Sequence, residues 1–283
     1  MWLFSETLNF TKIKQIGCAM EKQVDFQGKK INYSVTGTGL PVVLLHGFLE
    51  NLHIWDDLTG FLQAGFQVIA VDLPGFGKTP VFAENHTMPF MADAVKAVLE
   101  AEKVQQAVLV GHSMGGYISL AFAHRFPEMM KALVLFHSHA AGDDEQGKQN
   151  RTRTIEVVKK DHKDFIAQFI PLLFAEENVS KYSAEINRLR EVSLETSKEG
   201  VIAAMAGMRD RDDHLALLKN AGFPVFFVVG KQDSRIPTEK IMKQLALPEH
   251  AEAIILEHVG HMGFIEAPDK IFPVIKDFME RYR

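Results

Sequence analysis

The sequence predicts an α/β protein built on a doubly wound, mostly parallel sheet with helices on both faces. Short apolar runs of the strand type alternate along the chain with helical patterns, and this alternation gives right-handed β-α-β crossovers. One strand run passes abruptly into a helical pattern at residues 111–116, and one long stretch in the second half has helical periodicity alone. These features predict a functional turn at the sheet edge and an all-helical insertion.

The elements of the first half are predicted in order by changes of pattern. Residues 30–35 alternate in polarity, and a glycine and threonine cluster at 36–39 marks a turn. The next apolar runs are continuous, as is typical of strands buried on both faces of a parallel sheet, and they span residues 41–45, 68–71, 107–110 and 132–136. Helical patterns separate them at about 55–62, 88–101 and 117–126, and Pro127 ends the last one.

Helical periodicity replaces this alternation between residues 142 and 213. One apolar stripe includes Phe165 and Phe169 and another includes Val201 and Met205, with many charged residues between them. Strand runs return at 224–230 and 253–256, each followed by a helical pattern. We predict a helical lid at residues 142–213 over the carboxyl edge of the sheet, where open α/β sheets bind ligands, on a core of residues 20–141 and 214–283. The alternative is that these helices only extend the core.

Residues 1–19 carry neither pattern. Polar and charged residues soon interrupt the apolar opening at 1–4, so no signal-peptide core develops, and we expect these residues to be an N-terminal extension with little role in the fold. No apolar stretch approaches the roughly 18 residues that a membrane span needs. The single cysteine, Cys18, cannot form an intrachain disulfide, which favours a reducing compartment and hence the cytoplasm.

Charge and motifs restrict the partners of this chain. Its 283 residues carry a net charge of −5, which argues against a nucleic-acid surface. Asp72 stands where a P-loop at 72–79 would need its first glycine, and Val42 where a dinucleotide fingerprint at 37–42 would need its third. No cysteine cluster or i, i+4 histidine pair with a carboxylate indicates a metal site. We expect no cofactor, no metal, a small-molecule partner, and a monomer or homodimer.

The turn at residues 111–116 has the sequence Gly-His-Ser-Met-Gly-Gly and fits a nucleophile elbow. Ser113 stands at its apex, and the glycines two residues to either side avoid collisions across so tight a turn. The strained backbone lifts the hydroxyl group clear of the sheet, beside a helix N-terminus that favours negative charge. Ser113 is therefore the predicted nucleophile.

A serine hydroxyl group is a weak nucleophile until a base takes its proton and a third group orients that base. Of twelve histidines, His261 is the best placed, because it lies on the loop between the last strand and the last helix, at the same sheet edge as Ser113. Other loop histidines stay open as alternatives: His258, His137 and His139. Two histidines flank the key turns and are interpreted as structural: His46 and His112.

The predicted acid is Asp233, just past the carboxyl end of the strand run at 224–230. A carboxylate there can accept a hydrogen bond from the imidazole Nδ1–H and stabilise the imidazolium ion. The order Ser113, Asp233, His261 is also the order of the α/β hydrolases. Four aspartates that border the helical stretch fit this position less well: Asp143, Asp144, Asp212 and Asp213.

Attack by the serine creates an oxyanion that fixed donors must hold. The backbone N–H of Met114, directly after the nucleophile, is one predicted donor. The second is expected from the loop after the strand at 41–45, where Gly47 allows close backbone approach and Phe48 supplies the N–H.

Taken together, these motifs resemble the α/β-hydrolase superfamily over nearly the whole chain from about Met20. The matching stretches are residues 46–48, 72–77, 111–116, 230–233 and 260–261. The resemblance implies an eight-stranded, mostly parallel sheet with a helical lid, and within the superfamily the chain looks like the small capped carboxylesterases, lactonases and cofactor-free perhydrolases. Ser113 argues against the epoxide hydrolases and haloalkane dehalogenases, which carry aspartate there. The HGGG-type oxyanion motif of some lipases is absent, since Phe48 and Leu49 follow Gly47.

The sequence thus favours a serine hydrolase that cleaves a small or medium, largely apolar carboxylic ester through an acyl-enzyme intermediate. The apolar stripes of the predicted lid motivate the choice of substrate. Two alternatives stay open: a lactone or carbon–carbon bond hydrolase with the same triad, and a ligand-sensing protein of this fold with little turnover.

Overall fold

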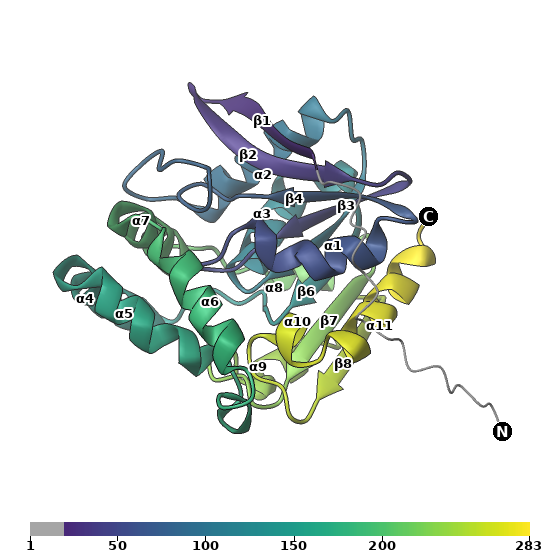
Figure 1. The fold of residues 1–283 in the computed structure, drawn as a ribbon. Helices are drawn as coiled ribbons and strands as arrows, with labels where there is room; N and C mark the ends of the chain where they lie inside the picture. Colours follow the sequence, from purple (N-terminus) through teal and green to yellow (C-terminus); the bar gives the residue numbers. More distant parts are fainter. Residues whose placement is uncertain (1–19) are drawn as a thin grey trace.

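A computed structural model of the protein describes residues 20–283, so the predicted extension at 1–19 lies outside the described residues. Eight strands form one sheet in the order β1-β2-β4-β3-β5-β6-β7-β8 (Figure 1). Their bounds are β1 Met20–Phe26, β2 Lys29–Thr36, β3 Leu40–Leu45, β4 Phe66–Val71, β5 Ala107–His112, β6 Met130–Phe136, β7 Val225–Gly230 and β8 Ala251–Leu256. Strand β2 runs antiparallel to β1 and β4, and the other neighbouring strands are parallel. The predicted fold class is confirmed.

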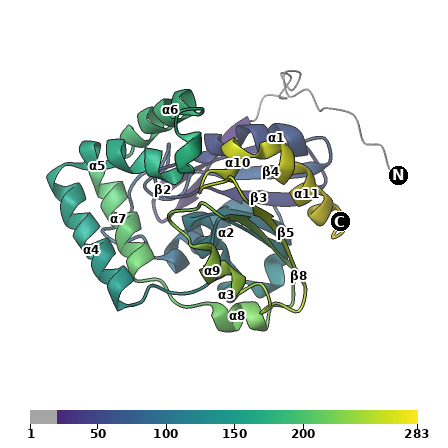
Figure 2. The ribbon, with the colours of Figure 1, turned by 90° about the horizontal axis from the view of Figure 1, so that it is seen from below.

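Helices cover both faces of this sheet. Helices α1 and α11 pack on one face and α2 and α3 on the other (Figure 2). The helices of the core are α1 Asp56–Leu62, α2 Met88–Ala101, α3 Met114–Arg125, α8 Leu215–Lys219, α9 Thr238–Met242, α10 Gly263–Glu266 and α11 Pro268–Glu280. No helix of the described residues is long and apolar enough to cross a membrane.

Residues 142–213 hold four further α-helices that stand beside the core (Figure 1). They are α4 Glu145–Lys160, α5 His162–Phe169, α6 Ser183–Leu194 and α7 Lys198–Arg209. The short 3-10 turns η4 Ile170–Leu173 and η5 Glu176–Asn178 join α5 to α6. Helices α4 and α7 pack along each other, and their inward residues face the ends of the parallel strands. The helical periodicity of this stretch is therefore that of helices which pack on one another and contact loops beside the sheet.

Burial explains why the central strands have continuous apolar sequences. Every residue of β5 and β7 is buried, because helices cover the sheet on both faces. The edge strands β1 and β8 are mostly exposed or half-buried, and their sequences mix polar with apolar residues. The helix predicted from about residue 55 begins as the 3-10 turn η2, Leu52–Trp55, before α1. The Asn51 side chain caps that turn by accepting a hydrogen bond from the N–H of His53 at 3.0 Å.

The loop after β4 is held by one buried carboxylate. Asp72 accepts hydrogen bonds from the backbone N–H groups of Leu52 and Lys78 and from the side-chain amide of Asn32, each at 2.9 Å. These partners come from three separate segments, so Asp72 fixes the loop at 72–79 against the start of η2 and against β2. Residues 72–79, which end like a P-loop in sequence, thus form a turn held by hydrogen bonds to the Asp72 carboxylate.

His86 fastens the loop before α2 to helix α7 and does so as a neutral ring. Its ring Nε2 accepts hydrogen bonds from the N–H groups of Phe82 at 3.0 Å and Ala83 at 3.3 Å, and its backbone N–H donates to the carbonyl of Ala203 at 3.0 Å. Burial lowers the pKa of His86 to about 4. Protonation at Nε2 would break both accepted hydrogen bonds.

Acid is therefore expected to destabilise the fold between pH 6.5 and 4. Burial also lowers the pKa of His137 to about 4 and that of His139 to about 3, whereas an unfolded histidine titrates near pH 6.5. Within this window the unfolded chain binds protons that the folded chain excludes, so the free energy of unfolding falls as the pH falls. The slope reaches about 1.4 kcal/mol per pH unit for each such histidine. Above pH 6.5 all three are neutral in both states and contribute no pH dependence.

Urea unfolding of the wild type and of His86→Gln at pH 7.5 and 5.0 measures this effect. His86→Gln is expected to reduce the loss of unfolding free energy between the two pH values by about 2 kcal/mol at most. The matched variant His250→Gln removes an exposed histidine and should keep the full loss. An identical pH dependence in the wild type and in His86→Gln would contradict the assignment.

Candidate active site

The turn between β5 and α3 places Ser113 in a conformation that only a constrained residue adopts. Its φ is 50° and its ψ is −111°, in the positive-φ region that L-residues rarely enter. A Cβ atom on the nearby glycines would collide with backbone of the elbow at Gly111, with the carbonyl of Leu45 at Gly115, and with the Ser138 side chain at Gly116. The glycines are needed because the strand, the helix and the neighbouring loops meet here without space for side chains.

Two hydrogen bonds hold the strained residue itself. The N–H of Ser113 donates to the carbonyl of Phe136 at 2.9 Å, and the hydroxyl group of Ser138 donates to the carbonyl of Ser113 at 2.8 Å. The strain is thus stabilised by the end of strand β6, next to the elbow. The hydroxyl group of Ser113 faces a cavity, and its residue is half-buried.

The predicted base and acid lie together at the ends of neighbouring strands. The Nδ1 of His261 is 2.7 Å from Oδ2 of Asp233, and both side chains are buried. The other carboxylate oxygen of Asp233 accepts hydrogen bonds from the N–H groups of Arg235 at 2.8 Å and Ile236 at 2.9 Å. Burial opposes ionisation of Asp233, but the neighbouring His261 and His137 overcome it and hold the pKa of Asp233 below its ordinary value. An ionised Asp233 fixes His261 with its proton on Nδ1, which leaves Nε2 free to act as a base.

The loop that carries His261 is fastened from the side of the inserted helices. The N–H of His261 donates to the carbonyl of Leu173 at 2.7 Å. The carboxylate of Glu266 accepts hydrogen bonds from the N–H of Ala175 at 3.1 Å and from the N–H of Gly260 at 3.0 Å. The segment at 170–178 therefore supports the loop that carries His261, although it lies within the inserted helical stretch.

The alternative histidines have different surroundings. His137 is buried, has a φ of 45°, and places its Nδ1 3.3 Å from Oδ2 of Asp233, behind the base. His139 lies beside Tyr117, with 3.5 Å between its Nε2 and the phenol oxygen. His258 is exposed and pairs with Glu177 at 2.7 Å. Only His261 among these four lines the cavity that Ser113 faces.

The alternative aspartates are committed to other contacts. Asp143 pairs with Arg211 at 2.8 Å and with Arg151. Asp144 caps helix α4 by accepting a hydrogen bond from the N–H of Gly147 at 2.8 Å. Asp213 accepts from the N–H of Leu215 at 2.9 Å, and Asp212 is exposed. None of these four contacts a histidine that lines the cavity.

One group of side chains in the described residues could share a metal ion. The nearest ligand atoms of His137, Asp233 and His261 all lie within 4.8 Å of one another. Two ligands of a tetrahedral zinc ion stand about 3.3 Å apart, given bonds of roughly 2.0–2.1 Å. The 2.7 Å between His261 and Asp233 is instead the distance of a charge-assisted hydrogen bond. The group therefore fits a base and its orienting acid better than a metal centre.

The two predicted backbone donors, the N–H groups of Met114 and Phe48, have no hydrogen-bond acceptor among the described residues. Met114 is the first residue of α3, where an N–H has no partner within the helix. The N–H of Phe48 follows Gly47, and within residues 20–283 neither donor has a protein acceptor. A side chain at Gly47 would collide with the Glu50 carboxylate and the His112 ring. The backbone of this loop is thus brought close to the elbow, as an oxyanion site requires.

A buried ion pair beneath the serine was missing from the sequence prediction. Oε2 of Glu50 accepts a hydrogen bond from the N–H of Gly47 at 2.5 Å and lies 3.0 Å from Nδ1 of His112. The other ring nitrogen of His112 donates to the carbonyl of His261 at 2.9 Å. Burial opposes both charges, but each group stabilises the other, so the pKa of Glu50 is lowered and the pKa of His112 is raised. The pair connects the Phe48 loop, the elbow and the histidine loop.

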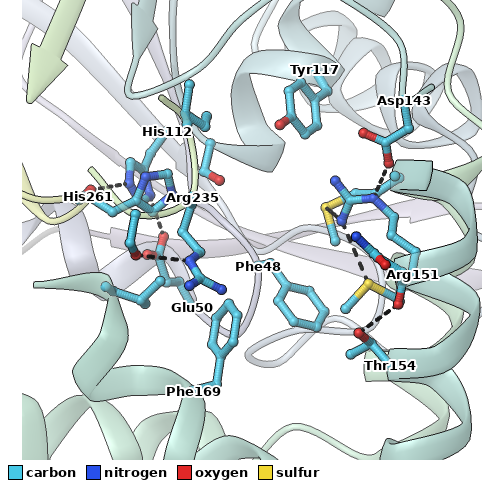
Figure 3. Close-up of a pocket in the computed structure, with 18 of the residues that line it drawn as sticks. Phe48, Glu50, His112, Tyr117, Asp143, Arg151, Thr154, Phe169, Arg235 and His261 are labelled. Atoms are coloured by element: carbon cyan, nitrogen blue, oxygen red, sulfur yellow. Dashed lines mark hydrogen bonds and ion pairs between the residues drawn. The ribbon is translucent and has the colours of Figure 1, made fainter. Parts of the chain in front are cut away.

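The serine, the histidine and Phe48 line one cavity of about 420 Å³ (Figure 3). Loops at the strand ends form one side, and residues of α4, α5 and α7 form the other. The apolar part of the wall consists of Phe48, Phe165, Phe169, Leu173, Ile236, Met205 and Met208. Charged and polar side chains also line it, namely Glu50, His112, Tyr117, Asp143, Asn150, Arg151, Thr154, Ser234 and Arg235. The predicted apolar stripes include the members of the first set that lie in the inserted helices, but not Ile236 or the polar residues.

Comparison with known proteins identifies similar chains. Residues 41–268 match the family model of the alpha/beta hydrolase fold. The chain is 27% identical over 254 residues to the pimeloyl-acyl-carrier-protein methyl ester esterase of Aeromonas hydrophila, covering 86% of this chain and 96% of that protein. It is 29% identical over 246 residues to the dihydrolipoyllysine-residue acetyltransferase component of an acetoin cleaving system from Pseudomonas putida. That match covers 86% of this chain, which spans only 64% of the longer protein.

Among solved structures, a malate-bound thermophilic esterase from Thermogutta terrifontis is similar over most of both chains. The TM-score is 0.88 at 30% sequence identity, over 93% of this chain and 99% of the esterase.

Proposed function

This chain is a hydrolase of the α/β-hydrolase family, and from that premise we propose that it is a serine esterase acting on a small or medium carboxylic ester. The observation that carries the proposal is the buried 2.7 Å hydrogen bond between His261 and Asp233, at the cavity that the strained Ser113 faces. A serine becomes a nucleophile when such an oriented base lies beside it. The esterases among the similar proteins support the same reaction class.

In the proposed reaction, Oγ of Ser113 attacks the ester carbonyl carbon while Nε2 of His261 takes the hydroxyl proton. The N–H groups of Phe48 and Met114 hold the negative charge that develops on the carbonyl oxygen. The imidazolium of His261 then protonates the leaving alkoxide, so an alcohol departs and the acyl group stays on Ser113. Water attacks this ester with His261 again as base, and the carboxylic acid leaves as Ser113 regains its proton.

The helices α4 to α7 are proposed to act as the lid over this reaction, on residues 142–213. Phe165 and Phe169 of α5 and Met205 and Met208 of α7 cover the cavity from that side. A cavity of about 420 Å³ suits a small ligand. The apolar wall supports a substrate with an apolar segment.

Covalent labelling tests this proposal directly. Diethyl p-nitrophenyl phosphate transfers its diethylphosphoryl group to an activated serine and releases p-nitrophenol. We expect one equivalent on Ser113 by peptide mass spectrometry, together with loss of p-nitrophenyl acetate hydrolysis. The control Ser234→Ala removes another serine of the same cavity and should be labelled at Ser113 as in the wild type. Labelling elsewhere, or turnover that survives full labelling, would overturn the nucleophile.

A further inference from the structure

The cavity contains one cation without a carboxylate partner. Arg151 also lines it, but its guanidinium pairs with Asp143 and contacts the sulfur atoms of Met205 and Met208 at 3.6 Å. Glu50 is paired with His112. Within residues 20–283, no carboxylate oxygen lies within 4.0 Å of the Arg235 guanidinium. Arg235 is therefore the arginine of the cavity wall that has no direct carboxylate partner within the described residues.

The position of Arg235 is set by its neighbours in the chain. Its backbone N–H donates to Asp233 Oδ1 at 2.8 Å, and its Nε donates to the Ser234 hydroxyl group at 3.1 Å. Its Cζ lies 5.4 Å from the centre of the Phe169 ring. Figure 3 shows the guanidinium between His261 and Phe169, directed into the cavity. The two terminal nitrogens of Arg235 have no protein acceptor within the described residues.

Asp233 stands two residues away and attracts the Arg235 guanidinium, but it forms no direct ion pair with it. One of its oxygens accepts from His261, and the other accepts from the N–H groups of Arg235 and Ile236. A direct ion pair between the Arg235 guanidinium and Asp233 would have to compete with these hydrogen bonds. The guanidinium is left without a direct carboxylate partner among the described residues.

We propose that Arg235 binds a carboxylate group of the substrate, so that the ester is a monoanion. This rests on the proposed ester hydrolysis and narrows its substrate class. The two terminal nitrogens present a planar fork that matches the two oxygens of a carboxylate. Arg235 is an exposed residue, and the Phe169 ring lies beside its guanidinium. The apolar segment between ester and carboxylate would then lie against the phenylalanine and methionine wall.

The test compares anionic esters with neutral esters in two matched pairs. Monomethyl adipate against methyl hexanoate places the carboxylate on the acyl side, and 4-acetoxybenzoate against phenyl acetate places it on the leaving group. We expect the wild type to prefer the anionic member of at least one pair about 10- to 100-fold in kcat/KM, because a charged hydrogen-bonded pair contributes roughly 1.5–3 kcal/mol.

Arg235→Gln is expected to lower that preference at least tenfold, mainly by raising KM for the anionic ester. Arg235→Lys keeps the charge without the fork and should restore part of the preference. The control Arg188→Gln makes the same charge change at an exposed position on α6, outside the cavity, and should retain the wild-type preference.

Two results would overturn the inference about Arg235. One is hydrolysis of the neutral esters with no preference for either anionic ester, which leaves the proposed esterase intact. The other is a wild-type preference that persists in Arg235→Gln. If no ester of either pair is hydrolysed and Ser113 is not labelled, the proposed function fails as well.

Discussion

Replacing Ser113 with alanine is expected to lower kcat for p-nitrophenyl butyrate about 10⁶-fold, to the residual rate that the oxyanion donors and substrate binding alone can support. Alanine at this position removes the hydroxyl group that is proposed to attack the ester carbonyl. The strained backbone at residue 113, with a φ of 50°, is the same for serine and for alanine, so the variant should keep the fold of the wild type. Steady-state hydrolysis and a thermal unfolding curve of each protein provide the measurement.

The control for this variant is Ser119→Ala. Ser119 lies on α3, less than two helical turns after Ser113, and is fully buried. Its hydroxyl group donates a hydrogen bond to the carbonyl of Gly115 at 2.8 Å. It does not line the cavity, so kcat should stay near that of the wild type. Ester turnover within tenfold of the wild type in Ser113→Ala would remove the serine from the mechanism.

Replacing Asp233 with asparagine is expected to lower kcat about 10⁴-fold with a much smaller change in KM. The amide can still accept the N–H groups of Arg235 and Ile236 through its oxygen, so the loop should keep its shape. Its NH₂ group, however, then faces Nδ1 of His261 and favours the tautomer with the proton on Nε2. A ring in that tautomer cannot accept the proton of Ser113.

Asp144→Asn is the matched control for the acid. Asp144 caps α4 and its carboxylate oxygen accepts from the N–H of Gly147, a hydrogen bond that asparagine can also accept. We expect nearly unchanged kcat in this variant. A loss of less than tenfold in Asp233→Asn would exclude Asp233 as the group that orients His261.

The sequence predicted the sheet well because its central strands are buried on both faces and therefore consist of continuous apolar residues. Strands β5 and β7 are buried at every residue and read as continuous apolar runs. The turn after β5 was predictable because only glycine fits at Gly111 and Gly115, so the steric demand of the elbow leaves a fixed pattern. Asp233 and His261 were predictable from their places after strand runs at the same edge.

Residues that act through tertiary contacts could not be predicted in the same way. Glu50 has no helical or strand periodicity, and its partner His112 is 62 positions away. A carboxylate three residues after Gly47 was the only available signal. In the sequence, Arg235 looks like an ordinary loop arginine. Only the structure shows that the carboxylate of Asp233 accepts hydrogen bonds from His261 and from two backbone N–H groups and forms no ion pair with the Arg235 guanidinium. The polar half of the cavity wall comes mainly from loops and from inward positions of α4, which the apolar stripes do not reveal.

The contacts of segment 170–178 distinguish it from helices α4 and α7, since only this segment hydrogen-bonds the loop that carries His261. The carbonyl of Leu173 holds the N–H of His261, and Glu266 holds the N–H of Ala175, so an exchange of this segment between relatives would disturb the base. Helices α4 and α7 pack mainly on each other, and their residues line the cavity without hydrogen bonds to His261. Substitutions in those two helices are therefore expected to change the cavity wall without disturbing the contacts that hold His261.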